Sequence, residues 1–266
     1  MLEHPSSTLA LKGYFVTNSI LSLQNVSVTF GALRAVDGVT LSVPAGQRRA
    51  IIGPNGAGKT TLFNAIAGVV PISSGTVHFN SVDMTRYTTN KRANLGISRT
   101  FQITNLFPQL TVQENIRLAV CGLSRRKFAL FGSGKPNLLE KEAIEHALEN
   151  SQLVEQRNAE VKTLSYGEQR QLEMAMALVQ KPKLLLLDEP AAGLSPAERV
   201  KLADVINALP RELTLILIEH DMDLALGLVD YVTCLHFGQV LTGGTPDEIR
   251  VDEKVQEVYL GKPRHA

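Results

Sequence analysis

Cysteine is scarce in this sequence, and its scarcity excludes a disulfide framework and a cysteine-held metal site. Only two cysteines occur among the 266 residues, Cys121 and Cys234, and they lie far apart without the spacing of metal ligands. We therefore expect two unpaired thiols, buried as small hydrophobic side chains in a protein of the reducing cytosol.

An excess of charge of one sign and a long apolar run are also absent. The formal net charge is +1, so the chain lacks the global basic field of a nucleic-acid-binding protein. No apolar run approaches the roughly 18–20 residues that span a bilayer. Residues 1–18 lack the charged start and apolar stretch of a secretory signal. We expect these residues to form a flexible extension. If the protein acts at a membrane, we expect it to bind on the cytosolic face.

The order of the expected elements indicates an α/β fold with two additions. Residues 21–30 and 35–43 alternate apolar and polar side chains, which predicts a small antiparallel sheet. The continuous apolar runs at 184–187 and 213–219 predict strands that are buried on both faces. The region between about 103 and 163 has helical spacing and predicts a helical insertion, in which Thr111–Glu114 reads as a capping box. Thr245–Glu248 predicts the start of a terminal helix.

The most specific motif is Gly53–Thr61 (GPNGAGKTT), which matches G-x-x-x-x-G-K-[ST] at every fixed position. An apolar strand precedes it and a helical segment follows, and this context distinguishes a phosphate-binding loop from an ordinary glycine-rich turn. Its glycines let backbone amides approach phosphate oxygens, and the helix N-terminus adds a positive dipole. We expect Lys59 to reach the β- and γ-phosphates and Thr60 to hold Mg²⁺. The predicted nucleotide-binding residues of the loop are Gly53, Pro54, Asn55, Gly56, Ala57, Gly58, Lys59, Thr60 and Thr61.

Polar side chains follow both buried strands at the sheet edge where α/β proteins bind ligands. Asp188 suits Mg²⁺ as a hard oxygen ligand, directly or through water. Glu189 suits the positioning or deprotonation of an attacking water. The two carboxylates cannot do the same job, because adjacent residues of an extended segment point to opposite sides. His220 follows the next strand, where a ring N–H could donate to the γ-phosphate or hold the water.

A second anion site is predicted at Leu164–Gln169 (LSYGEQ), where the Ser165 hydroxyl and the Gly167 amide stand at a helix start. One chain that already has a P-loop does not need a second anion site. The site is explained if it contacts a γ-phosphate that is bound by another subunit. Two further predictions concern single residues. Gln102, at the border of the helical insertion, could contact Mg²⁺ or the water and report that contact to the insertion. Phe30 could stack on adenine, with an ordinary core phenylalanine as the alternative.

These residues, in this order, resemble the ATP-binding cassette family over about residues 21–261. In the terms of that family, the resemblance identifies Gly53–Thr61 as the Walker A motif, Gln102 as the Q-loop and Leu164–Gln169 as the signature. It identifies Leu184–Glu189 as Walker B, Ala192–Ser195 as the D-loop and His220 as the switch histidine. The signature departs from the usual Leu-Ser-Gly-Gly-Gln, because it has Tyr166 and Glu168 at the third and fifth places. Ser165 and Gly167 are kept, so we expect closure on ATP to survive.

Within the family, the chain looks like the ATPases of branched-chain amino acid importers, the LivG type. The segments that carry this likeness are RTFQITNLFPQLTVQEN, LSYGEQ, DEPAAGLSP, IEHDM and VQEVYLG. The resemblance implies a P-loop NTPase with a RecA-like core at about 19–102 and 171–266, an antiparallel β subdomain, and an inserted α-helical subdomain at about 103–170. ATP and Mg²⁺ are the implied cofactors.

The implied partners are a paralogous ATP-binding subunit in a head-to-tail dimer, two membrane permeases and, indirectly, a solute-binding protein, with no nucleic acid. The implied function is ATP hydrolysis that energises uptake of branched-chain or related amino acids. Import of urea, short amides or aromatic acids and export of lipopolysaccharide are the alternatives within transport. A cassette acting on DNA or ribosomes is disfavoured by the single P-loop and the modest insertion. A metabolic kinase would not need the second anion site.

Overall fold

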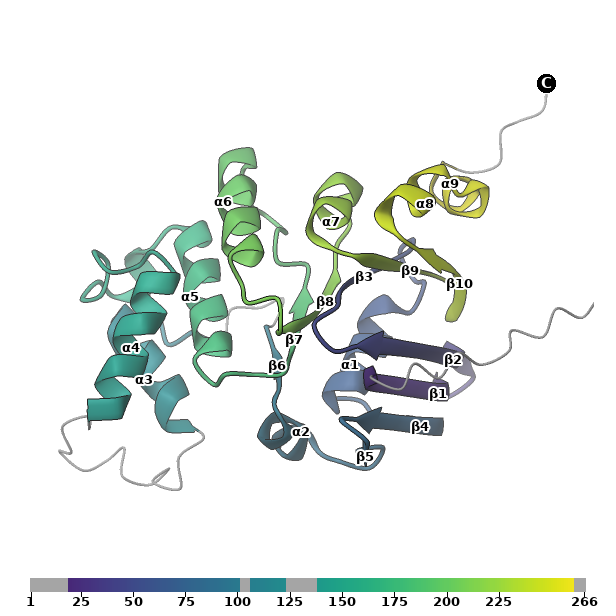
Figure 1. The fold of residues 1–266 in the computed structure, drawn as a ribbon, viewed down its shortest axis with the longest axis horizontal. Coiled ribbons are helices and arrows are strands. Elements are labelled where there is room, and N and C mark those ends of the chain that lie inside the picture. Colours follow the sequence, from purple (N-terminus) through teal and green to yellow (C-terminus); the bar gives the residue numbers. More distant parts are fainter. Residues whose placement is uncertain (1–18, 101–105, 123–137, 261–266) are drawn as a thin grey trace, which may run out of the picture.

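The computed structural model describes residues 19–100, 106–122 and 138–260, which form two sheets with helices between and around them (Figure 1). The strands are β1 (Ser19–Phe30), β2 (Leu33–Pro44), β3 (Arg48–Ile52), β4 (Ser74–Phe79), β5 (Val82–Asp83), β6 (Ile97–Arg99), β7 (Leu184–Asp188), β8 (Thr214–Ile218), β9 (Tyr231–His236) and β10 (Gln239–Gly244). The helices are α1 (Lys59–Ala67), α2 (Thr89–Leu95), α3 (Val112–Gly122), α4 (Leu138–Asn150), α5 (Tyr166–Leu178), α6 (Pro196–Asn207), α7 (Met222–Leu228), α8 (Pro246–Val251) and α9 (Glu253–Leu260).

The larger sheet has the strand order β10-β9-β3-β8-β7-β6 and is parallel except for β10, which pairs antiparallel with β9. Its central strands are buried on both faces, as their continuous apolar sequences predict. Within β7, Leu184 and Leu186 join the core on the α1 side, whereas Leu185 and Leu187 join the core on the opposite side. This alternation places Asp188, the last residue of β7, in register with the α1 side.

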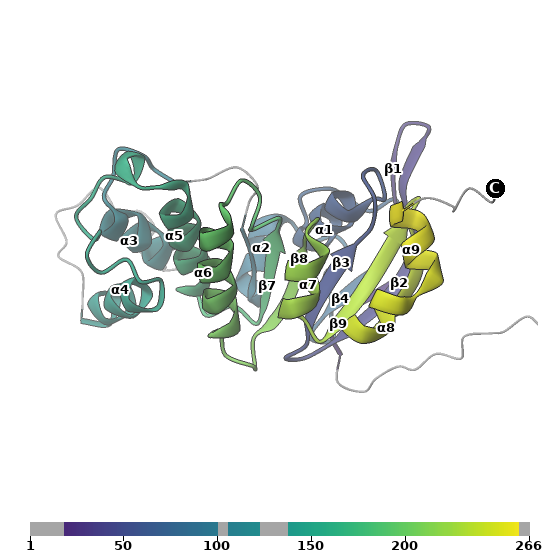
Figure 2. The same cartoon turned by 90° about the horizontal axis from the view of Figure 1, so that it is seen from above.

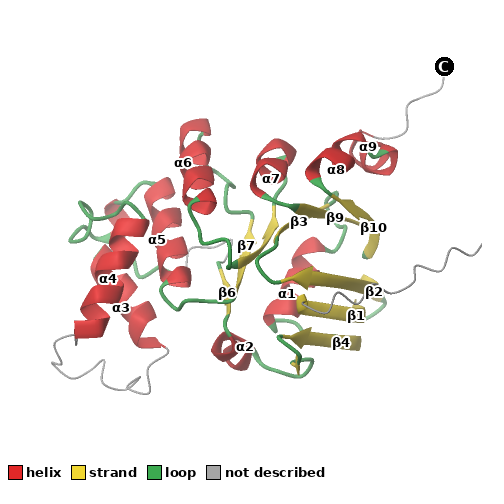
Figure 3. Ribbon diagram, in the orientation of Figure 1, coloured by secondary structure: helices red, strands yellow, loops and turns green. Residues whose placement is uncertain are grey.

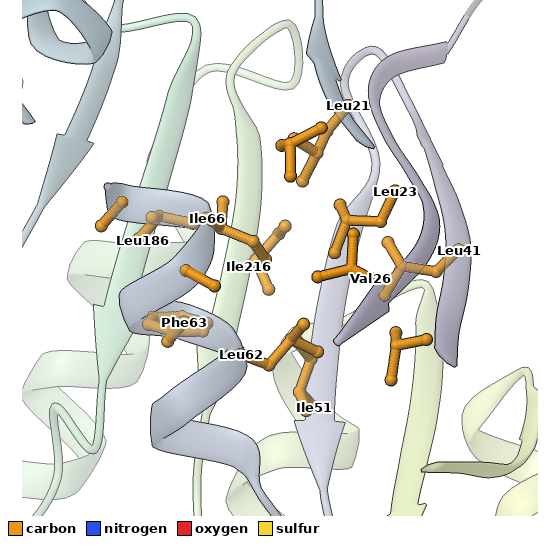
Figure 4. Close-up of a cluster of buried hydrophobic side chains, with 14 of the residues drawn as sticks. Leu21, Leu23, Val26, Leu41, Ile51, Leu62, Phe63, Ile66, Leu186 and Ile216 are labelled. Carbon is orange, nitrogen blue, oxygen red and sulfur yellow. The ribbon is translucent and has the colours of Figure 1, made fainter. Parts of the chain in front are cut away.

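The smaller sheet is antiparallel, has the order β2-β1-β4-β5, and confirms the sheet expected from residues 21–43. Its apolar side chains meet those of α1 and of the larger sheet in one core (Figure 4). Phe63 and Ile66 of α1 belong to this core together with Leu186 and Ile216 of the parallel strands and the apolar side chains of β1. The helix that follows the P-loop is therefore held from both sides, which fixes the position of its N-terminus.

Helices α3, α4 and α5 gather at one end of the molecule, away from the smaller sheet (Figures 2 and 3). The predicted capping box opens α3: the Thr111 amide donates to Glu114, and the Glu114 amide donates to the Thr111 hydroxyl. Helix α5 contributes Leu172 to this helical core and Met174 to the core beneath the parallel sheet. The proposed border near residue 170 therefore falls inside a helix that both subdomains share.

The C-terminal region forms two helices in place of the one terminal helix expected from Thr245–Glu248. A capping box at Thr245 and Glu248 starts α8, which ends at Val251. Asp252 is extended, and its carboxylate accepts hydrogen bonds from the amides of Lys254 and Val255, which starts α9. The interruption turns α9 back toward the parallel sheet, where Val255 is buried.

The two cysteines are free thiols, as expected: Cys234 is buried and Cys121 is half-buried. Burial raises the pKa of the Cys234 thiol to about 11. None of the helices in the described part of the chain is both long and apolar enough to cross a bilayer.

Candidate active site

The P-loop begins where β3 leaves the sheet, and it is packed too tightly for side chains at two of its glycines. Gly53 has φ +146°, and a Cβ atom there would lie 2.2 Å from the Leu235 carbonyl oxygen. A Cβ atom at Gly58 (φ +96°) would lie 2.4 Å from the Ala35 carbonyl oxygen. The close approach of these backbones explains why the motif requires glycine at both positions.

Lys59 is the first residue of α1 and is folded back over the loop. Its Nζ atom donates to the carbonyl oxygens of Gly53, at 2.7 Å, and Pro54, at 3.0 Å. Burial lowers the pKa of the Lys59 ammonium, whereas the neighbouring carboxylates of Glu189 and Asp188 oppose that shift. A cation that is already desolvated and adjacent to backbone amides is well prepared for a polyphosphate.

A cleft lies over the P-loop and gathers five segments of the chain. Its lining residues are Leu33, Arg34, Ala35, Asn55, Gly56, Ala57, Gly58, Lys59, Thr60, Thr61, Glu189, His220, Phe237 and Gly238. The predicted loop residues from Asn55 to Thr61, Lys59 among them, are thus brought together with Glu189 and His220. Gly53 and Pro54 lie beneath them and contribute carbonyl groups to Lys59. Phe30 does not line the cleft, although it pairs across the β-turn with Leu33, which does.

Asp188 is buried at the end of β7 with one oxygen paired and the other without a partner. Its Oδ2 atom accepts from Arg99 Nη2 at 2.7 Å, and Arg99 Nη1 donates to Asn64 Oδ1 of α1. Its Oδ1 atom is buried and makes no hydrogen bond. Burial raises the pKa of Asp188, and the bond from Arg99 opposes that rise.

Asp188 does not itself line the cleft, although the next residue, Glu189, does; the unpartnered oxygen of Asp188 fits Mg²⁺ held beside the P-loop. A buried carboxylate oxygen without a partner is a hard ligand for that ion, directly or through water. Among the described residues, no group of three or more histidine, cysteine, aspartate or glutamate side chains could hold a metal. If Mg²⁺ binds here, Asp188 and Thr60 would hold it together with phosphate oxygens and water, the usual mode of binding for this ion at phosphate sites.

Glu189 and His220 form a direct pair. Glu189 Oε1 lies 2.6 Å from His220 Nε2, so that two side chains from adjacent strand ends share one hydrogen bond. Glu189 has φ +49°, a rare conformation for a residue with a side chain, and its amide donates to the Ile218 carbonyl. The chain thus bends sharply after Asp188 instead of continuing as the extended segment that was expected, and this bend directs one carboxylate toward Arg99 and the other toward His220.

A third carboxylate, that of Glu219, holds the backbone next to this pair. Its role was not predicted from the sequence. It is buried, accepts the Ala191 amide at Oε1 (2.8 Å), and accepts the His220 amide at Oε2 (3.2 Å). Burial raises the pKa of Glu219, and the two amides oppose that rise. From the sequence there was no reason to assign Glu219 a role, because it belongs to no motif apart from its position next to His220.

The signature segment lies outside the cleft. Ser165 caps α5 in a capping box with Glu168, and the Glu198 carboxylate of α6 lies against Gly167, where a Cβ atom would be 2.7 Å from Oε1. Hydrogen bonds from Ser195, and a weaker one from the Gly167 backbone, lower the pKa of Glu198. A carboxylate therefore already faces the Gly167 amide, which agrees with an anion-accepting surface.

Tyr166, the departure from the usual signature, connects the signature to the D-loop. Its hydroxyl accepts from Arg170 Nη2 at 2.8 Å. A Cβ atom at Gly193 would lie 3.2 Å from the Tyr166 ring. Gln102 lies outside the described residues, which end on that side at Thr100, whose amide donates to the Leu186 carbonyl.

Comparison with known proteins agrees with this geometry. The sequence pattern described as "ABC transporter" matches residues 36–192, more than half of the chain. The chain belongs to the ABC transporter family. A second pattern, described as "Branched-chain amino acid ATP-binding cassette transporter", matches residues 239–265 of the cassette.

Relatives of the cassette match along nearly all of its length. It is 38% identical over 254 residues to the high-affinity branched-chain amino acid transport ATP-binding protein BraF of Pseudomonas aeruginosa, covering 93% of this chain and 100% of BraF. It is 37% identical over 256 residues to LivG of Escherichia coli K12, with the same shares covered. The ADP conformation of MJ1267, an ATP-binding cassette of an ABC transporter, has a TM-score of 0.82 at 32% identity and covers 92% of this chain and 100% of MJ1267.

These likenesses confirm the fold class and the biochemical class expected from the motifs. The cassette is a P-loop NTPase with an antiparallel β subdomain and an inserted helical region, and it is an ATP-binding and ATP-hydrolysing protein.

Proposed function

We propose that the cassette is the ATPase subunit of an importer for branched-chain or related amino acids. The observation that carries the cargo class is the match of residues 239–265 to the branched-chain cassette pattern, together with the likeness to BraF along the whole chain. Urea, short amides and aromatic acids are the alternative cargoes, and they remain outcomes of the test. The same match favours uptake over export of lipopolysaccharide.

In this proposal the P-loop binds the triphosphate. Backbone amides of Asn55–Thr61 surround the phosphates, and the Lys59 ammonium turns from its two carbonyl partners toward the β- and γ-oxygens. Thr60, Asp188 and Gln102 would hold Mg²⁺, which neutralises phosphate charge when it is bound. Leu33 and the exposed ring of Phe237 line the outer part of the cleft, where an adenine base would contact them in place of, or beside, Phe30.

Hydrolysis in this proposal depends on the Glu189–His220 pair. The Glu189 carboxylate accepts a proton from the attacking water, and the hydrogen bond to His220 fixes the direction in which that carboxylate points. His220 and Lys59 then face the developing charge on the γ-phosphoryl group. Glu219 keeps the His220 backbone in place.

The signature segment supports a partner, because Ser165 and Gly167 do not line the cleft of their own chain. We propose a head-to-tail dimer with a paralogous cassette, in which these residues meet the γ-phosphate held by the other subunit. Two permeases would bind this dimer at the cytosolic face of the membrane, and a solute-binding protein would deliver cargo from outside.

Uptake by proteoliposomes tests the cargo class. The cassette, its partner cassette and both permeases would be reconstituted with internal ATP and supplied with the solute-binding protein and labelled leucine, urea or benzoate. We expect uptake of leucine with wild-type cassette and none with Glu189→Gln. Uptake of urea or benzoate without leucine would overturn the cargo assignment and leave the ATPase assignment intact.

A further inference from the structure

The C-terminal helix α9 reaches the first residue of the P-loop. The Gly53 amide donates to the Tyr259 hydroxyl oxygen at 2.6 Å, although the two residues are 206 positions apart in the sequence. Tyr259 belongs to the stretch 239–265 that matches the branched-chain cassette pattern. The nucleotide site thus has a contact with a segment outside the match to the general ABC transporter pattern, which ends at residue 192.

A displacement of the Gly53 backbone would also move a hydrogen-bond acceptor of Lys59. Its amide is held by Tyr259, and its carbonyl oxygen accepts from Lys59 Nζ at 2.7 Å. The Leu235 carbonyl blocks movement on the remaining side, where even a Cβ atom would lie at 2.2 Å. The orientation of the Gly53 residue, with φ +146°, therefore depends on Tyr259 on one side and on Leu235 on the other.

Tyr259 is itself anchored independently of the cleft. Val255, one turn earlier in α9, is buried, and Tyr259 packs against the core beneath the parallel sheet. Asp252, which starts α9, also accepts from the Thr242 hydroxyl of β10 at 3.0 Å. Burial raises the pKa of the Tyr259 hydroxyl to about 12, so the group stays neutral at physiological pH.

We propose that Tyr259 is a positioning residue for ATP binding, which fixes Gly53 and thereby the start of the loop from which Lys59 reaches the phosphates. The hydroxyl oxygen accepts the hydrogen bond of the Gly53 amide, for which the described part of the chain shows no other acceptor. Without the hydroxyl, a buried donor is left without an acceptor, and the loop must shift to find one. In this proposal, helix α9 contributes to ATP binding by holding the first residue of the P-loop in place.

Tyr259→Phe tests this inference, because it removes the hydroxyl and keeps the ring. We expect the Kd for ATP, measured by calorimetry on the full chain, to rise about three- to tenfold, the range that one lost hydrogen bond produces. The KM for ATP in the assembled transporter should rise by the same factor, whereas kcat should change less than about twofold, since Glu189 and His220 are untouched. Tyr231→Phe is the matched control, because Tyr231 is a half-buried tyrosine of β9 that does not line the cleft.

Two results would overturn the proposal. One is a lower melting temperature for Tyr259→Phe with an unchanged Kd for ATP, which would make the tyrosine a packing residue only. The other is an equal rise in Kd for Tyr231→Phe, which would make the effect general. Hydrogen exchange on the wild-type chain needs no variant: ATP should slow exchange in both the peptide containing Gly53 and the peptide containing α9. Protection of the P-loop peptide alone would refute the coupling.

Discussion

Glu189 Oε1 and His220 Nε2 lie 2.6 Å apart, which makes these side chains one hydrogen-bonded unit at the edge of the cleft. They come from the ends of β7 and β8, two strands that pair in parallel register with Asp188 opposite Ile218. The Glu189 amide donates to the Ile218 carbonyl, so the backbone also joins the two strand ends. Removal of either side chain therefore takes away a hydrogen-bond partner of the other.

The first prediction concerns this pair. We expect Glu189→Gln to lower ATP turnover in the assembled transporter by at least about a hundredfold, the lower range for loss of a positioned base. The Kd for ATP should change less than about twofold, because the P-loop supplies the affinity. Because the two residues act as a unit, adding His220→Ala to Glu189→Gln should lower turnover no more than about tenfold further. Fully additive losses in this double-mutant cycle would separate the two roles.

The second prediction concerns Asp188, whose Oδ1 atom is buried without a hydrogen bond. We expect Asp188→Asn to raise the Mg²⁺ concentration needed for half-maximal turnover by about tenfold or more, as with other losses at metal sites. ATP binding in the presence of EDTA should be unchanged. Asp204→Asn, at an exposed position of α6, is the control and should leave the Mg²⁺ requirement as it is. An unchanged requirement in Asp188→Asn would exclude the carboxylate from the metal site.

The third prediction separates capping from recognition in the signature. Ser165 and Thr245 each start a helix with a capping box, so replacing either by alanine should lower the free energy of unfolding by about 1 kcal/mol. Only Ser165→Ala should lower turnover in the assembled transporter, because in the proposed dimer only that hydroxyl meets the partner's nucleotide. Ser165→Arg should abolish turnover and leave ATP binding to the single chain unchanged. Loss of that binding would place Ser165 in its own chain's site.

Motifs that are contiguous in the chain could be predicted from the sequence. Gly53–Thr61 was recognisable because strand, glycine-rich turn and helix follow one another, and Asp188–Glu189 because four leucines precede them. The Thr111–Glu114 capping box was predicted for the same reason, since its hydrogen bonds span three residues. Local spacing is the physical cause of such structures, so local spacing reports them.

Residues that reach the site through long-range contacts gave no such signal. Phe237 lines the cleft because the Gly238 amide donates to the Ala57 carbonyl, across 181 positions of the chain. Arg99 holds Asp188 from a strand that enters the sheet beside β7. Tyr259 reaches Gly53 only because Asp252 turns α9 back toward the sheet. Each contact depends on sheet order, which periodicity does not specify.

Glu219 belongs to this second group, and its burial has a consequence for stability. Its exposed fraction is only 4%, and burial raises its pKa above the ordinary value of 4.5. A carboxyl group with a raised pKa in the folded state binds its proton more tightly there than in the unfolded chain. The stability that comes from this group is therefore complete below pH 4.5 and is lost as the pH rises through the folded-state pKa.

The fourth prediction follows from that sign. Glutamine cannot ionise, so Glu219→Gln should gain stability relative to wild type as the pH is raised from 4 to 7, by about 1 kcal/mol or more for each unit of pKa shift. Its amide group opposite the His220 N–H adds a cost that does not depend on pH and does not alter this trend. Urea unfolding of both proteins at several pH values measures the difference. Glu212→Gln, at an exposed position, controls for loss of one carboxylate. A stability difference between wild type and Glu219→Gln that widens against the variant as the pH rises would show that Glu219 is stabilised as the anion in the folded state.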